Sequence, residues 1–125
     1  MGFLNPQDKM LDFGTVTLST GLTSGAASFP NKLRIENADI NGMQIGFEYS
    51  ILPAGGTAIT FSLEGSNDDS TYVEIGAVTG SLTKPTFLAI PRDTSYKYLV
   101  AKVKASTGTF TAGVVHAAID TYVGK

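Results

Sequence analysis

Apolar and polar positions alternate along much of the chain, and this two-residue period is typical of β-strands with one buried face. The longest alternation places five apolar residues on one strand face: Met43, Ile45, Phe47, Tyr49 and Ile51. Residues 59–63, 72–77 and 96–105 show the same period. No segment has a sustained helical period, so the pattern predicts an all-β chain.

Turn-forming residues separate these runs: Asn41 and Gly42, the PAGG stretch at residues 53–56, Pro91, and the STG stretch at residues 106–108. Further strands are expected over residues 11–19 and 109–122, with a small-residue loop over residues 20–32. Seven to eight short strands with tight turns predict an antiparallel β-sandwich of the jelly-roll type. We expect one domain over residues 1–125, with residues 1–10 as an N-terminal arm.

The last predicted strand carries apolar residues on both faces, whereas the outer face of a two-layer sandwich is normally polar. Phe110, Ala112, Val114 and Ala118 share one face, and Val115, Ala117 and Ile119 share the other. Either loops cover the outer face, or it meets a neighbouring subunit. The preceding strand carries Tyr96, Tyr98 and Val100 on its outward face, and these side chains could contact the same neighbouring subunit. The candidate subunit-interface residues are therefore Tyr96, Tyr98, Val100, Val115, Ala117 and Ile119.

An acidic stretch lies between two of the alternating runs, where residues 63–75 read LEGSNDDSTYVEI. Asn67, Asp68 and Asp69 suit a hairpin loop, because Asn and Asp side chains bond nearby backbone groups and tolerate left-handed dihedrals. The spacing lacks the alternating ligands, central Gly and distant Glu of an EF-hand loop. We assign the stretch to turn formation, with a weak cation site as the alternative.

Composition excludes several kinds of function. A chain of 125 residues can fold without a disulfide or metal, and the absence of Cys excludes disulfides and Cys-ligated zinc. A single histidine excludes a two-histidine mechanism within one chain. A net charge of −2 without a basic stripe argues against a nucleic-acid partner. No apolar run is long enough to cross a membrane, and the opening residues do not form a signal peptide, so we expect a soluble, unprocessed protein.

The charge content favours a partner of another kind. Only 16% of the residues are charged, so a soluble chain of this composition would have a rather apolar exterior. We expect another protein to cover part of that exterior.

No set of residues predicts a reaction. Glu64 and Glu74 lie on the same side of the predicted hairpin, and paired carboxylates serve glycosidases, but a solvated strand face is the commoner use. His116 lies among Val, Ala and Ile without a nucleophile motif, and the glycines fit no phosphate-binding pattern. We predict no catalytic residue, no metal site and no cofactor, and hence a protein that is not an enzyme.

The order of four stretches resembles a known family. These are FSLEGSNDDSTYVEIG, IPRDT, YKYLVAKVKAS and GTFTAGVVHAAID, within about residues 57–122. They are similar to the small jelly-roll capsid cement (decoration) proteins of tailed bacteriophages, in which an acidic hairpin precedes a Pro-Arg turn, a Tyr/Arg-rich strand and a TAG strand. The matching residues are Ser66, Asn67, Asp68 and Asp69 for the hairpin, Pro91 and Arg92 for the turn, Tyr96 and Tyr98 for the aromatic strand, and Thr111, Ala112 and Gly113 for the last motif.

The resemblance implies a homotrimer on the outer capsid surface of the virion, made in the host cytoplasm, that cements the head by bridging adjacent major capsid proteins. The second hypothesis is a carbohydrate-binding or host-adhesion β-sandwich module. Such a module would present a surface row of aromatic rings to a sugar, here Tyr72, Tyr96 and Tyr98, since the chain has no Trp. An enzyme is the third and least supported hypothesis.

Overall fold

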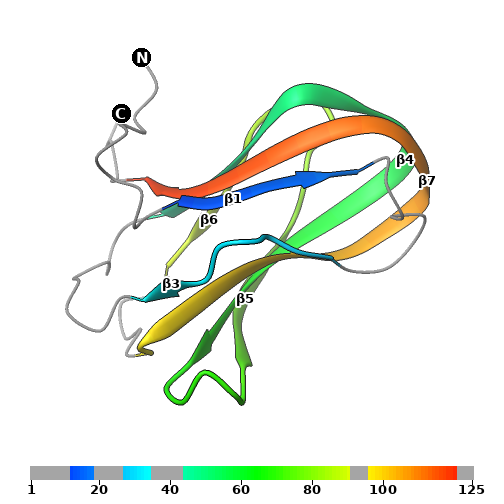
Figure 1. Cartoon of the computed structure of the whole chain (residues 1–125). Helices are drawn as coiled ribbons and strands as arrows, with labels where there is room; N and C mark the ends of the chain where they lie inside the picture. The colour runs from blue at the N-terminus through cyan, green and yellow to red at the C-terminus, as the bar shows by residue number, and fades with distance from the viewer. Residues whose placement is uncertain (1–11, 19–26, 35–43, 91–95, 121–125) are drawn as a thin grey trace.

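A computed structural model describes residues 12–18, 27–34, 44–90 and 96–120 (Figure 1). Within these ranges the chain forms one antiparallel seven-stranded sheet and no helix, which confirms the all-β prediction. No described helix could therefore span a membrane. The strands are β1 (Asp12–Thr17), β2 (Ala27–Ser28), β3 (Leu33–Arg34), β4 (Gln44–Ser66), β5 (Val73–Thr79), β6 (Thr86–Ala89) and β7 (Tyr98–Asp120). The predicted arm, the Asn41–Gly42 turn and the Pro91–Arg92 turn lie outside the described residues.

Two long strands organise the sheet. β4 and β7 pair in antiparallel register from Gln44 opposite Asp120 to Ser66 opposite Tyr98. Both strands curve strongly near their middle, so the ladder folds back over itself (Figure 1). One half of the folded sheet adds β1 and β6, and the other half adds β2, β3 and β5. Both layers of the sandwich thus come from a single sheet.

The bend has a local cause in the sequence. Register shifts interrupt the β4–β7 ladder between Tyr49 and Ala58, and such bulges bend a strand. Gly55 has φ of 93°, and a Cβ there would lie 2.4 Å from the carbonyl oxygen of Thr109, so only glycine fits. The PAGG and STG stretches were predicted to be turns between strands. They lie instead within β4 and β7, where they curve the strands without ending them.

The core fills the space between the two halves. The stacked rings of Phe47 and Phe61 lie 4.3 Å apart between centroids at an interplanar angle of 10°, and each ring comes from a different half. The buried cluster comprises Phe13, Leu18, Phe29, Leu33, Ile45, Phe47, Ile59, Phe61, Leu63, Ile90, Leu99, Ala101, Val103, Phe110, Val115, Ala117 and Ile119. Most of these side chains follow the predicted alternation.

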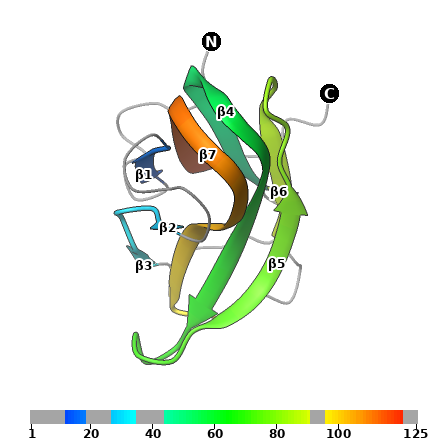
Figure 2. The ribbon, with the colours of Figure 1, turned by 90° about the vertical axis from the view of Figure 1, so that its right-hand side faces the viewer.

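The two sides of the sandwich are closed differently. Between β1 and β7, the backbone N–H of Phe29 donates to Ala101 O and that of Asn31 donates to Phe13 O, both at 2.9 Å, so this short segment connects the two halves. On the other side, β6 pairs with the first half of β4 and β5 pairs with its second half (Figure 2). The sandwich thus has the bend of β4 and β7 at one end, and the β4–β5 hairpin lies away from that bend (Figure 1).

Candidate functional site

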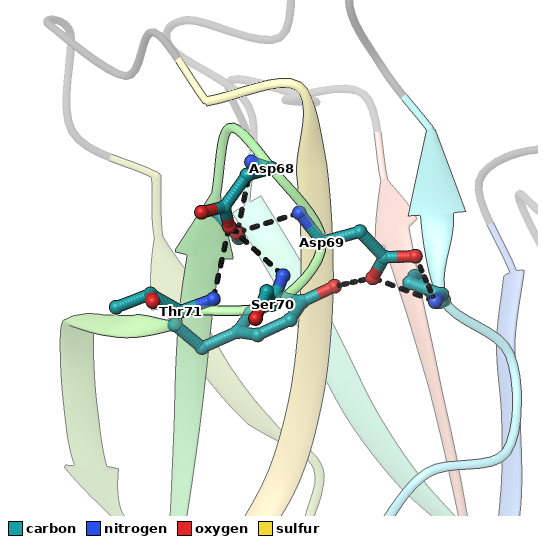
Figure 3. A network of polar contacts seen from close by, with 7 residues as sticks. Asp68, Asp69, Ser70 and Thr71 are labelled. Carbon is teal, nitrogen blue, oxygen red and sulfur yellow. Dashed lines mark hydrogen bonds and ion pairs between the residues drawn. The ribbon is translucent and has the colours of Figure 1, made fainter.

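The acidic stretch forms the predicted hairpin loop between β4 and β5, with Glu64 opposite Glu74 in register. The Asp68 carboxylate turns into the loop, where its Oδ1 accepts hydrogen bonds from the backbone N–H groups of Ser70 (2.8 Å) and Thr71 (2.9 Å) (Figure 3). The Ser66 hydroxyl oxygen accepts from the backbone N–H of Asp69 at 2.9 Å. These bonds to nearby backbone groups are the turn chemistry expected of Asp and Ser.

The carboxylate of Asp69 points away from the loop and connects it to a distant segment (Figure 3). Lys32 Nζ lies 2.6 Å from both carboxylate oxygens, and the Tyr72 hydroxyl donates to Oδ1. The hydrogen bonds from Lys32 and then from Tyr72 lower the pKa of Asp69. Loss of hydration, followed by the bond to Asp69, raises the pKa of Tyr72 to about 12. Among the described residues, no group of three or more Asp, Glu or His side chains is placed to hold a metal ion.

Acid should loosen this hairpin. The backbone hydrogen bonds from Thr71 and Ser70 lower the pKa of Asp68 below its ordinary value of 3.8, so the stabilisation is present above that value and is lost as pH falls through the folded pKa. Melting temperatures measured from pH 6 downwards should therefore fall less steeply below about pH 4 in Asp68→Asn, which keeps an acceptor oxygen but does not titrate.

If the melting temperatures of the wild type and Asp68→Asn fall equally steeply with decreasing pH, Asp68 does not have this role. A large fall in the wild-type melting temperature on adding EDTA at neutral pH would show that a bound cation, and not the turn hydrogen bonds, orders the loop.

The six candidate interface residues fall into two groups. Val115, Ala117 and Ile119 are 0%, 0% and 1% exposed and belong to the core, so they have no surface to offer a second subunit. That part of the prediction is corrected: these side chains pack against the other half of the same sheet. Tyr96, Tyr98 and Val100 are partly exposed, and their role in an interface stays a prediction.

A glycine explains why the last strand looked apolar on both faces. Phe110 and Val115 both lie in the core although they have opposite parity along the strand. Between them Gly113 has φ of 138°, and the register with β4 shifts between Ala112 and Val114. The interruption reverses the inward face, so neither loops nor a neighbouring subunit are needed to explain the pattern.

The three tyrosines proposed as a sugar-stacking row do not share one environment. Lys32 connects Tyr72, through Asp69, with the ring of Tyr98, whose centroid lies 5.9 Å from both Lys32 Nζ and Arg34 Cζ. The ring of Tyr96 instead lies over Gly65, beside Ile75. The structure therefore brings two of the three tyrosines into one cluster.

The remaining candidate residues hold strands together. Glu64 lies 3.5 Å from Lys102 Nζ, and Glu74 lies 2.9 Å from Lys104 Nζ, so each carboxylate of the facing pair has its own lysine. Glu64 and Glu74 thus each form an ion pair with a lysine and are not left as an isolated acid and base.

The partner of His116 was not found from the sequence. His116 Nε2 lies 2.7 Å from Oδ1 of Asp12, which also accepts the backbone N–H of Gly14 at 2.7 Å. This contact fixes β1 on β7 across a separation of 104 residues. No local pattern signals a pairing over such a distance.

The sequence also missed two exposed apolar side chains. Ile51 and Leu52, in the bend of β4, are 54% and 56% exposed, although the alternation predicted Ile51 to be buried. A register shift between Tyr49 and Ile51 turns the strand at this point. Pro53 and the glycines after it were the available signal, because they mark a place where the alternation can break.

No protein-family model matches the sequence, and no curated protein matches it either.

Proposed function

We propose that this chain is a structural protein of a bacteriophage virion that decorates the capsid and cements it by bridging adjacent major capsid proteins. The observation that carries the proposal is that the candidate chemical groups connect segments of the chain that are distant in sequence. Asp12, Glu64, Asp69 and Glu74 each contact a basic side chain of another segment. This use of the carboxylates favours a structural role, which requires no free acid or base.

The order of sequence motifs supplies the rest of the support. It favours a jelly-roll homotrimer on the outer capsid surface, with the major capsid protein as partner. Several identical domains joined together multiply weak contacts through effective concentration, so a small domain can reinforce a shell without one very tight interface.

Phage heads prepared without this protein should bind it when the purified protein is added. The bound protein should raise the temperature at which the heads rupture. Cosedimentation with heads measures binding, and release of packaged DNA on heating measures rupture. The double variant Glu64→Gln, Glu74→Gln should bind and protect as the wild type does, because cementing needs no acid or base. Absence of cosedimentation by the folded wild type would contradict the proposal.

A carbohydrate-binding module is the second candidate, and the cluster of Tyr72, Tyr98, Lys32 and Arg34 is what favours it. Sugar sites combine aromatic rings with hydrogen-bonding side chains. Here, however, the Tyr72 hydroxyl and Lys32 already bind Asp69, and Tyr96 lies elsewhere. Glycan-array binding that disappears in Tyr98→Ala would favour this candidate over cementing.

A further inference from the structure

The bend end of the sandwich is free of ionisable residues. It consists of two runs, residues 50–60 (SILPAGGTAIT) and 105–115 (ASTGTFTAGVV), which contain no Asp, Glu, Lys, Arg or His. The runs pair with each other where β4 and β7 fold over, and most of their residues are exposed. We call the surface formed by the exposed residues of these two runs the bend end. It is an exposed part of the protein built only from apolar, glycine and hydroxyl-bearing residues.

Two neighbouring aliphatic side chains project from the bend end. Ile51 and Leu52 are each more than half exposed, and they are adjacent in the chain. The other large exposed apolar residues in the described part of the chain are Val73 and Phe87, which lie on different strands. Adjacent exposed aliphatic residues in an uncharged surface have the composition of an interface centre, where charged residues are depleted.

The nearest ionisable residues on either side of the second run are paired within the chain. Lys104 precedes the second run and contacts Glu74, and His116 follows it and contacts Asp12. The Lys32–Asp69 pair lies at the hairpin, away from the bend (Figure 1). The bend end therefore has no ionisable group of its own with which to select a charged partner.

A charge-free surface suits contact between copies of the same chain. When copies of a chain meet around a rotation axis, the same residues converge from each copy, and a charge near the axis faces its own like charge. The bend end avoids this repulsion.

We propose that the bend end is the surface through which copies of this chain contact one another, with Ile51 and Leu52 at the centre of the contact. This deepens the proposed function and rests on it for the expectation of a symmetric assembly. It replaces the buried side chains Val115, Ala117 and Ile119 with exposed ones as the apolar centre.

Light scattering coupled to size exclusion tests the inference on the full chain. Wild type should elute at two or more times the single-chain mass of 13.1 kDa, and Leu52→Lys should elute at the single-chain mass with an unchanged circular dichroism spectrum. Thr109→Lys, on the other strand of the bend end, should behave in the same way. The matched control is Val73→Lys, which alters a side chain of similar exposure on β5 and should keep the wild-type mass.

A wild type that stays at 13.1 kDa over the whole concentration series would overturn the inference, as would wild-type mass for both Leu52→Lys and Thr109→Lys. If Leu52→Lys fails to fold, Thr109→Lys decides. Head binding separates the two proposals. A single-chain wild type that still binds heads overturns the inference alone, whereas an assembled wild type that does not bind heads overturns the proposed function alone.

Discussion

Val115→Asp is expected to unfold the protein, while Val114→Asp leaves it folded. Val115 is fully buried and lies in register between Val16 and Tyr49. The cluster around it is apolar, so an aspartate there would be a buried carboxylate without a basic partner. The expected cost is about 3–5 kcal/mol, which is a large share of the stability of a small domain.

Val114 provides the matched control because it is the adjacent residue of the same strand, with the same side chain, and is partly exposed. An aspartate there keeps its hydration in the single chain, so the fold should be retained even where the bend-end contact between copies is lost. Circular dichroism and thermal melting of the two variants measure the difference. Equal stability of the two variants would show that the inward face of β7 has been assigned wrongly.

Phe61→Ala is expected to produce the second large loss. Its ring stacks on Phe47 from the opposite half of the folded sheet, so the substitution opens a cavity where the two halves meet. Deleting a buried phenylalanine ring costs about 3–5 kcal/mol of unfolding free energy. Chemical denaturation should show this loss.

Phe87→Ala is the control for the same chemical change. The Phe87 side chain is 44% exposed on β6, so its removal should cost about 1 kcal/mol or less. If Phe61→Ala is no more destabilising than Phe87→Ala, the two halves of the sheet do not share the core described here.

The alternation of apolar residues predicted the all-β fold and much of the core, because inward and outward positions repeat strictly within a regular strand. Phe47, Phe61, Leu99 and Val103 are buried as that rule requires. The rule fails where the strand itself is irregular. A register shift exposes Ile51.

At Gly113 the second irregularity buries Val115, which had been assigned to a subunit interface. Bulges leave little trace in a single sequence beyond glycine and proline, and those residues equally suit turns. The PAGG stretch was therefore predicted to end a strand that in fact continues through it.

Interactions within the acidic hairpin were predictable, whereas those between segments were not. The hydrogen bonds of Asp68 join residues three positions apart or fewer, and local turn chemistry anticipates them. The contact of Asp69 with Lys32 spans 37 residues. Such pairs depend on how the sheet folds over, which local patterns do not encode.

Electron cryomicroscopy of phage heads with and without the protein tests the cementing role most directly. If the protein cements the shell, added density should appear at symmetry-related positions on its outer surface, each position touching at least two neighbouring major capsid proteins. Heads whose outer surface is unchanged by saturating protein would contradict that role.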